Sequence, residues 1–324
     1  MRTEIVCTIG PASWDQEIMN KMAAAGMKFA RVNGAFADAA ELDKVAALAR
    51  GTGAEIKLML DVKGPEVRMN KFSNPIELFP GKEIIIGNDE TSEIFPANYQ
   101  DLYTKLQPRQ RMVIGDGDVE LVLDRIDGDK MVCKVVFGDT LKPGKALNLP
   151  GANYATDVLT DKDKENIAHA ISTGWEYVSA SFVQSAEAAK QINEITQGKM
   201  KLVAKIEDQM GIDNIDQILP EVWGIMIARG GLGVELGFEN VPAAQRLLVA
   251  KAHAAGKFSI VATQMFESMI QSPRPTRAEI NDVATAVWQG ADAVMLSAES
   301  SAGKYPVDAV EWMAKVANAA ELQS

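Results

Sequence analysis

Cysteine and histidine are scarce in this sequence of 324 residues, which contains two of each. Cys7 and Cys133 lie in separate apolar, strand-like runs, so neither a disulfide framework nor a zinc cage is expected. His169 and His253 lie in alanine-rich segments with helical spacing, where we expect structural roles. A Ser/His/Asp triad or a histidine-rich metal site is hard to assemble from so few histidines. The fold should therefore depend on packing, in a reducing compartment.

Long hydrophobic runs and an excess of positive charge are also absent. No apolar run approaches the roughly 20 residues of a membrane span, and residues 1–6 lack the apolar core of a signal peptide. The formal net charge is -11 and is spread along the chain, which argues against nucleic acid or a membrane surface as a partner. Hydrophobic residues at 47% can fill a sizeable core. The sequence predicts a soluble, cytoplasmic protein in which an anionic ligand needs a local cationic pocket.

Strand-like runs alternate with amphipathic segments from the first residues, a pattern typical of a parallel sheet with crossover helices. The first strands and helices are predicted at 5–9, 15–25, 29–33, 38–50 and 56–62. Ser13 is a plausible N-cap for the first helix. From residue 69 to about 147 the helical period disappears, and short β-rich pieces alternate with Gly, Pro and Asp turn signals. The β/α alternation then resumes.

The strands outside this stretch number about eight, which is the number that closes a (β/α)8 barrel, the TIM-barrel architecture. We therefore predict an α/β fold with two domains. Residues 1–68 and 148–324 form the barrel, and residues 69–147 form a small all-β domain, or lid, inserted after the third strand.

Lys201–Glu207 is an apolar strand that ends in a cation and a carboxylate. Side chains alternate along an extended chain, so Lys205 and Glu207 point to the same side of the sheet. A surface ion pair at a strand terminus is the simple alternative. Similar polar residues end the other predicted strands, where catalytic groups of such barrels collect: Arg31, Asn33, Asp61, Lys63, Ser181, Thr263, Gln264, Ser297 and Glu299. Cations can hold phosphate or carboxylate, and carboxylate oxygens suit Mg²⁺, so the mixture favours an anionic, oxygen-rich substrate.

These residues belong to longer blocks distributed along the whole chain: Thr8-Ile-Gly-Pro-Ala-Ser, Asp61-Val-Lys-Gly-Pro-Glu-Val-Arg, Asn148-Leu-Pro-Gly, Ser181-Phe-Val-Gln-Ser, Ala204-Lys-Ile-Glu, Ala228-Arg-Gly-Gly-Leu-Gly-Val-Glu, Ala262-Thr-Gln-Met-Phe-Glu-Ser-Met, Pro273-Arg-Pro-Thr-Arg-Ala-Glu and Asn281-Asp-Val-Ala. In content and order the blocks resemble the pyruvate kinase family. The resemblance implies a barrel with an inserted β-domain. It also implies a glycolytic phosphotransferase that uses phosphoenolpyruvate and ADP to form pyruvate and ATP, with Mg²⁺ or Mn²⁺.

The resemblance also assigns roles to individual residues. It implies that Lys205 bridges the transferring phosphoryl group and stabilises the enolate, that Arg31 binds phosphate, and that Thr263 lies near the proton-transfer site. The implied substrate-binding set is Arg31, Lys205, Ser181, Thr263 and the N–H groups of Gly230 and Gly231. The implied metal set is Glu207, Asp61 and Asn33. The implied nucleotide set is Asn33, Arg68 and Lys145, and for Arg68 a hinge salt bridge is the alternative.

The sequence departs from the family pattern around the cations. The family usually reads Arg-Leu-Asn-Phe-Ser-His-Gly where this chain reads Arg31-Val-Asn-Gly-Ala-Phe-Ala. Ala35 and Val62 therefore replace two side-chain ligands of the monovalent-cation site, so K⁺ is not expected. Gly231 replaces the second carboxylate of the divalent-metal site, which should weaken that site. The sequence resembles a short form of the family, without the usual C-terminal domain, so allosteric control of the familiar kind is not expected.

Three functions remain open from the sequence. The first is phosphoryl transfer of the pyruvate kinase type, independent of K⁺ and impaired by Gly231. The second is a repurposed enzyme that acts on a 2-oxo acid or enol phosphate by enolisation, decarboxylation or C–C cleavage. The third is a non-catalytic, anion-binding homologue. A homo-oligomer is expected from the resemblance.

Overall fold

The structure, a computed structural model, describes residues 2–64, 67–69, 74–87, 101–115, 117–152 and 158–323. The chain folds into two compact units. One comprises Met1–Gly64, Asp157–Gly230 and Asn240–Ser324, and the other comprises Pro65–Thr156 and Gly231–Glu239. The division thus falls a few residues outside the predicted insert of 69–147, and it places the short segment after Gly230 in the second unit.

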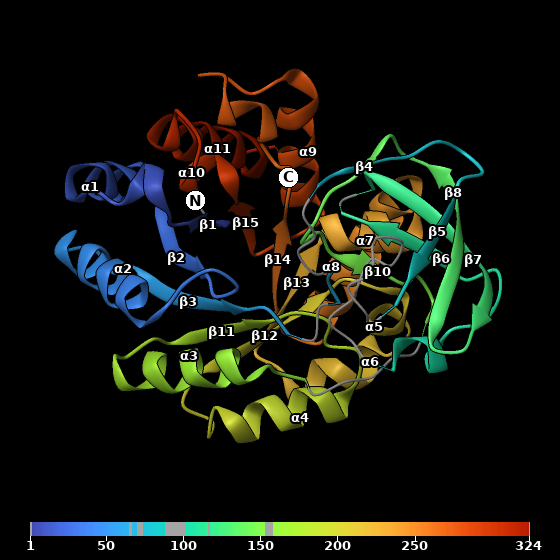
Figure 1. The fold of residues 1–324 in the computed structure, drawn as a ribbon. Helices are drawn as coiled ribbons and strands as arrows, with labels where there is room; N and C mark the ends of the chain where they lie inside the picture. The colour runs from blue at the N-terminus through green and yellow to red at the C-terminus, as the bar shows by residue number, and fades with distance from the viewer. Residues whose placement is uncertain are drawn as a thin grey trace. The chain divides into compact units, whose positions relative to one another are not determined.

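The first unit is a closed barrel of eight parallel strands, which confirms the predicted (β/α)8 fold (Figure 1). Around the barrel the strands follow the order β1-β15-β14-β13-β12-β11-β3-β2. Their bounds are β1 (Glu4–Thr8), β2 (Met27–Asn33), β3 (Lys57–Val62), β11 (Tyr177–Ala180), β12 (Lys201–Ile206), β13 (Gly224–Ala228), β14 (Phe258–Ala262) and β15 (Ala293–Leu296).

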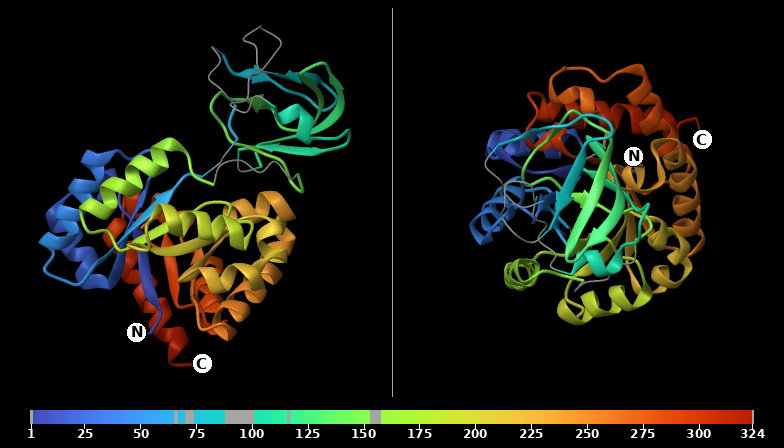
Figure 2. Two further views of the ribbon diagram at one scale, coloured as in Figure 1. Left: turned by 90° about the horizontal axis from the view of Figure 1, so that it is seen from below. Right: turned by 45° about the vertical axis from the view of Figure 1, so that its right-hand side comes forward.

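Helices surround the strands of this unit (Figures 1 and 2). The α-helices are α1 (Gln16–Ala25), α2 (Ala39–Gly51), α3 (Asp161–Ser172), α4 (Ala186–Ile195), α5 (Gln209–Asp213), α6 (Ile215–Ile218), α7 (Arg229–Leu236), α8 (Val241–Ala254), α9 (Arg277–Trp288), α10 (Ala298–Ser301) and α11 (Pro306–Glu321). The 3-10 helices of this unit are η1 (Pro11–Ser13), η3 (Leu219–Glu221) and η5 (Glu267–Ile270), whereas η4 (Phe238–Asn240) lies mostly in the second unit. Helix α7 begins in the barrel unit and continues into the second unit after Gly230. In the described part of the chain, no helix combines the length and the apolar character needed to cross a membrane.

Side chains define where several helices begin. Thr160 and Asp163 form a reciprocal capping box at the start of α3. The N-cap of α1 is Asp15, whose carboxylate accepts hydrogen bonds from the N–H groups of Glu17 and Ile18. The prediction of Ser13 as this N-cap was wrong, because the Ser13 hydroxyl bonds to the backbone of Gly10 within η1. A carboxylate two residues later was therefore available to satisfy the first amides of α1.

The barrel interior contains a layer of apolar side chains, with at least one from each strand. Its buried members are Val6, Phe29, Met59, Tyr177, Val203, Met226, Ile260, Ala262, Ala293 and Met295. Successive side chains of a strand point to opposite faces, so the residue two positions further along each strand also faces the interior. Applied to four of the strands, this rule gives a second, polar layer of inward-facing side chains, closer to the carboxyl ends of the strands. Its members are Thr8, Arg31, Asp61 and Lys205.

Aromatic rings fill the opposite end of the barrel. Phe29 and Tyr177 pack edge to face with ring centroids 5.1 Å apart, and Trp223 stacks on Phe258 at 4.5 Å. The Lys57 ammonium lies 4.6 Å from the Phe29 ring centroid, where a cation–π contact is favourable. This end is therefore packed, and the polar layer at the carboxyl ends of the strands is the part of the barrel suited to bind a ligand.

The second unit is built from antiparallel sheets, as the β-rich stretch predicts. One sheet has the strand order β10-β6-β7-β8-β5, and β4 pairs with β9 in a second sheet. The bounds are β4 (Ile76–Glu77), β5 (Glu83–Ile86), β6 (Arg111–Ile114), β7 (Val119–Asp127), β8 (Lys130–Phe137), β9 (Thr140–Leu141) and β10 (Leu147–Asn148), with the 3-10 helix η2 (Leu102–Lys105). The unit has its own hydrophobic core, which includes Ile86, Met112 and Cys133.

Candidate active site

Lys205 lies at the centre of the polar layer, near the end of β12. Its Nζ donates to the Ser181 hydroxyl at 2.6 Å and to Asp61 Oδ1 at 3.2 Å, and it lies 3.5 Å from Glu207 Oε1. Burial favours the neutral amine, but the two carboxylates outweigh it, and the net pKa of Lys205 is raised above its ordinary value. Lys205 is therefore a fixed cation at neutral pH. This geometry is unlike the mobile surface ion pair that the sequence left open, because only 12% of the side chain is exposed.

Asp61, at the end of β3, joins the two cations of the site. Its Oδ2 accepts a hydrogen bond from Arg31 Nε at 2.8 Å, and its Oδ1 accepts from Lys205. Burial would raise the pKa of the Asp61 carboxyl, but Arg31 and Lys205 reverse the effect, so that the pKa lies below its ordinary value. Asp61 is therefore an anion whose two oxygens are both committed to cations.

Arg31 is held from a second direction by Thr8. Arg31 Nη1 donates to the Thr8 hydroxyl at 2.8 Å, and that hydroxyl donates to the Leu296 carbonyl at 2.9 Å. Thr8 and Arg31 are register partners on neighbouring strands, and both are buried. Because Nε and Nη1 are committed, Nη2 is the guanidinium nitrogen left to bind a ligand; the described residues offer it no acceptor.

Glu207 follows β12 directly and is partly fixed by the backbone. Its Oε2 accepts a hydrogen bond from the Phe182 N–H at 3.0 Å, and 11% of its side chain is exposed. Phe182 has a left-handed backbone (φ 55°), which is uncommon for a bulky residue. Burial raises the pKa of the Glu207 carboxyl, and Lys205 offsets only part of that effect.

Thr263 and Gly230 meet just beyond the ends of two neighbouring strands, because Thr263 follows β14 and Gly230 is the second residue of α7, which follows β13. The Gly230 N–H donates to the Thr263 hydroxyl at 2.8 Å, and that hydroxyl donates to the Ala262 carbonyl at 2.7 Å. The Gly230 N–H therefore already has a protein acceptor, which an incoming carboxylate would have to displace or share. Gly231, the next residue, lies in α7 and belongs to the second unit.

The predicted nucleotide residues fall into separate groups. Asn33 ends β2 in the barrel unit, where its Oδ1 accepts from the Ala35 N–H at 3.2 Å. Arg68 and Lys145 lie together in the second unit, because Arg68 forms a β-bridge with Ala146. Arg68 Nη1 donates to the Gly144 carbonyl at 2.9 Å, and Lys145 Nζ lies 3.1 Å from Asp118 Oδ2.

Whether the site can hold a divalent metal ion depends on which carboxylate oxygens are not already bonded to protein cations. Glu207 can supply one carboxylate, whereas Asp61 is committed to Arg31 and Lys205. Across the described ranges, no group of three or more His, Cys, Asp or Glu residues is arranged to hold a metal ion. Mg²⁺ often uses only one or two protein carboxylates and takes its other ligands from water and substrate phosphates. The residues therefore fit Mg²⁺ as a minimal site centred on Glu207.

Two residues for which the sequence indicates no role also contribute to this site. Thr8 holds Arg31, and Asp163 accepts hydrogen bonds from the N–H groups of Lys63 and Gly64 at the end of β3. The two-residue alternation from Val6 could have identified Thr8, because it places the hydroxyl on the inner face. Asp163 had a helix-capping signal, but no sequence signal for its contact about 100 residues away.

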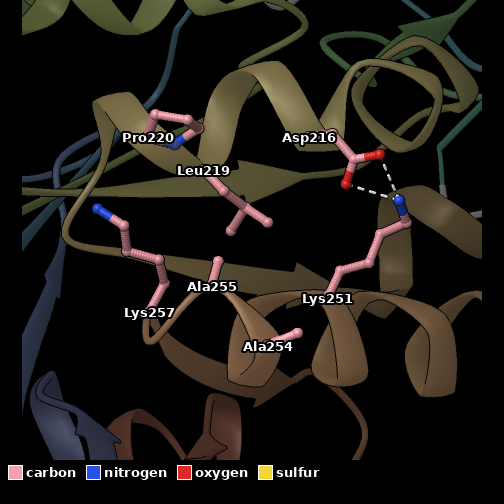
Figure 3. A pocket seen from close by; sticks show the side chains of 7 residues that line it. All are labelled: Asp216, Leu219, Pro220, Lys251, Ala254, Ala255 and Lys257. Atoms are coloured by element: carbon pink, nitrogen blue, oxygen red, sulfur yellow. Dashed lines mark hydrogen bonds and ion pairs between the residues drawn. The ribbon is translucent and has the colours of Figure 1, made fainter.

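A separate hollow of about 490 Å³ is lined by side chains from α6, η3 and α8, with Lys257 just before β14 (Figure 3). Lys251 Nζ pairs with Asp216 Oδ1 at 2.6 Å, and Lys257 Nζ donates to the Val222 carbonyl at 2.7 Å. The lining segments lead into the amino ends of β13 and β14, away from the polar layer. Both lysines already have protein partners, so the hollow is a weaker candidate than the polar layer.

Comparison with known proteins shows which family this chain resembles. Residues 1–310 match the family described as "Pyruvate kinase, barrel domain". Curated pyruvate kinases from Staphylococcus saprophyticus and Geobacillus stearothermophilus are each 39% identical over 99% and 98% of this chain. The crystal structure of a pyruvate kinase from Cryptosporidium parvum is 35% identical over 99% of this chain, with a TM-score of 0.94.

The match covers nearly all of this chain but only part of each relative. The chain spans 57% of the Staphylococcus saprophyticus protein, 56% of the Geobacillus stearothermophilus protein and 69% of the Cryptosporidium parvum chain. The resemblance stated from the sequence blocks is confirmed: this chain belongs to the pyruvate kinase family.

Proposed function

We propose that the chain transfers a phosphoryl group from phosphoenolpyruvate to ADP, in a reaction of the pyruvate kinase type that depends on Mg²⁺ or Mn²⁺ and not on K⁺. The observation that carries this proposal is the environment of Lys205. Its buried ammonium is fixed by Ser181, Asp61 and Glu207. Phosphoryl transfer relies mainly on positioning and on neutralising developing charge, which a preorganised cation of this kind supplies.

The residues of the polar layer have complementary roles in this reaction. Lys205 stabilises charge on the transferring phosphoryl group and on the enolate left behind. The free Nη2 of Arg31 binds phosphate oxygen, and Thr263 lies where the enolate carbon takes up its proton. Asn33, Arg68 and Lys145 are proposed to contact the nucleotide. The reaction is proposed to take place in the cytoplasm, and the protein to form a homo-oligomer.

A divalent ion bound to Glu207 would neutralise phosphate charge. Members of the pyruvate kinase family generally use Mg²⁺. Glu207 is the ligand we propose in this chain. Among the described residues, its carboxylate accepts a hydrogen bond from one backbone N–H and from no side chain, so Oε1 remains available to a metal ion. Asn33 could contribute a lone pair of its amide oxygen, whereas Asp61 would first have to release a cation.

Enolisation of a 2-oxo acid is the second candidate function. This candidate is favoured because both Asp61 oxygens accept hydrogen bonds from cations, so that Asp61 is a poor metal ligand. The cations that would bind a 2-oxo acid, Arg31 and Lys205, are still in place. A 2-oxo acid needs a cation to stabilise its enolate and a group to move a proton, and Lys205 and Thr263 satisfy these needs.

Gly231→Asp is expected to lower the Mg²⁺ concentration for half-maximal activity about tenfold, because it adds a carboxylate where the family has one. The new residue is the third of α7, where a negative charge is also favourable for the helix. The measurement is pyruvate formation from phosphoenolpyruvate and ADP, with Mg²⁺ and Mn²⁺ titrated separately. Gly231→Asn is the matched control, since it adds similar bulk without the charge.

The same assay distinguishes the candidate functions. Turnover in the native chain supports phosphoryl transfer, whereas no native turnover but recovery in Gly231→Asp would reject it for this sequence. Proton exchange at the methyl group of pyruvate, without ATP formation, would support the second candidate. Absence of both activities in both proteins would leave a non-catalytic anion-binding protein.

A further inference from the structure

The loop that follows β14 has an unfavourable backbone conformation at the residue proposed to act in proton transfer. Thr263 and Gln264 both have positive φ values, 70° and 52°. Left-handed conformations cost of order 1–3 kcal/mol for residues other than glycine, and a β-branched side chain such as that of Thr263 adopts them rarely. Surrounding contacts must therefore hold this loop in place.

Arg229, the first residue of α7, makes those contacts. Its Nε donates to the carbonyl oxygens of Ala262 and Thr263 at 3.1 and 3.2 Å, and its Nη2 donates to the Thr263 carbonyl at 2.5 Å. Nη2 also lies 2.9 Å from the sulfur of Met265. A single guanidinium thus contacts three of the four residues from Ala262 to Met265.

The guanidinium is itself fixed by residues from two other helices. Arg229 Nη1 lies 2.8 Å from both carboxylate oxygens of Asp282 in α9 and 3.3 Å from Gln245 Oε1 in α8. The Arg229 side chain is 10% exposed, and Gln245 is buried. Burial of a charged group is costly unless it is paired, so the Asp282 carboxylate makes this position of Arg229 favourable.

The same part of the chain also orients the Thr263 hydroxyl. Gly230, next to Arg229, donates its N–H to that hydroxyl. At the far end of the loop, the buried Glu299 accepts a hydrogen bond from the Phe266 N–H at 3.1 Å. The Thr263 carbonyl and hydroxyl are thus both held by the start of α7, while a carboxylate anchors the end of the loop.

We propose that Arg229, fixed by Asp282 and Gln245, is a positioning residue that holds the Thr263 hydroxyl for proton transfer to the enolate carbon. Arg229 acts through the backbone of Thr263 and does not touch the substrate. This inference rests on the proposed phosphoryl-transfer function, because that function gives Thr263 its chemical role.

A double-mutant cycle with Arg229→Met and Thr263→Val tests the proposal. Thr263→Val should lower kcat about 10²-fold, the magnitude typical of a proton-transfer group. Arg229→Met should lower kcat by roughly tenfold to 10²-fold, with the KM for phosphoenolpyruvate changed less than about threefold. If Arg229 acts through Thr263, then Arg229→Met should change kcat less than about twofold in the Thr263→Val background.

Further variants separate positioning from a general loss of folding. Asp282→Asn removes the anion that fixes Arg229 and should lower kcat in the same direction by a smaller factor. Arg229→Lys should restore only part of the activity, because an ammonium cannot bond two carbonyls and a carboxylate in the fixed planar geometry of a guanidinium. Arg50→Met is the matched control, since the Arg50 guanidinium also donates to a loop carbonyl, that of Thr173, but outside the polar layer. Its kcat should be unchanged.

Amide hydrogen exchange across residues 262–266 supplies a readout that does not depend on turnover. Exchange there should accelerate in Arg229→Met and not in Arg50→Met. Additive effects of Arg229→Met and Thr263→Val on kcat, or unchanged exchange in Arg229→Met, would overturn the proposal while leaving phosphoryl transfer intact. A native chain without pyruvate formation would instead overturn both the proposed function and this inference.

Discussion

Replacement of Lys205 by methionine is expected to lower kcat for pyruvate formation from phosphoenolpyruvate and ADP about 10³-fold. Methionine preserves much of the length of the lysine side chain and removes its charge. The KM for phosphoenolpyruvate should change less, because Arg31 would still present a cation to the phosphate. The loss should therefore appear mainly in kcat, as expected for a group whose interaction strengthens in the transition state.

Lys201→Met is a suitable control because Lys201 lies at the other end of the same strand, on the same face. Its ammonium lies 5.2 Å from the Tyr177 ring centroid and 5.6 Å from that of Trp223. Loss of these contacts should cost about 1 kcal/mol of stability, with kcat unchanged. A Lys205→Met protein that is folded and retains kcat within about threefold would contradict the role proposed for Lys205.

The strand content of the barrel and the inward direction of its polar residues could be predicted because both depend on local rules. Strands and helices alternate with recognisable periods, and a period of two places Lys205 on the same face as Val203. The confirmed barrel then brings the carboxyl ends of all eight strands together. Arg31, Asp61 and Lys205 were therefore predicted to be neighbours even though up to 174 positions separate them in the sequence.

The partner of each polar group could not be predicted in the same way. The family resemblance implies Asp61 as a metal ligand, and no sequence pattern indicates that it is the counterion of Arg31 and Lys205. In the structure, one Asp61 oxygen accepts a hydrogen bond from Arg31 and the other accepts one from Lys205, because two neighbouring buried positive charges require a negative charge between them. The contact of Arg229 with the Thr263 loop joins two chain segments more than 30 residues apart, and no local pattern indicates it.

The exact start of a helix is also difficult to predict when two nearby residues can both serve as its N-cap. Ser13 and Asp15 both suit a helix N-cap, and the outcome depended on where the turn after β1 ended. The assignment of Gly231–Glu239 to the second unit depends on packing, which the periodicity of α7 does not reveal. Arg111 Nη1, for example, donates to the Val234 carbonyl at 3.0 Å within that unit.

Replacement of Asp61 by asparagine is expected to lower the free energy of unfolding at pH 7 by about 3–5 kcal/mol, the usual effect of breaking a buried ion pair at one partner. Asp61 is 2% exposed, and the variant would leave Arg31 and Lys205 without the carboxylate that lies between them, although Glu207 Oε1 would remain 3.5 Å from Lys205 Nζ. Urea unfolding measures the loss. Asp216→Asn is the matched control, because the Asp216 side chain is 72% exposed and its pair with Lys251 should contribute less than about 1 kcal/mol.

The difference in stability between the native protein and Asp61→Asn should also depend on pH. The pKa of Asp61 in the folded protein lies below its ordinary value of 3.8, so folding favours the ionised carboxylate. Its contribution is fully present above the pKa of the unfolded chain and is lost as pH falls through the lower pKa of the folded state. The difference between the two proteins should therefore narrow in acid, at pH values near and below that ordinary pKa. A difference that stays constant from pH 7 into this acidic range would show that the Asp61 carboxylate is not held ionised by Arg31 and Lys205.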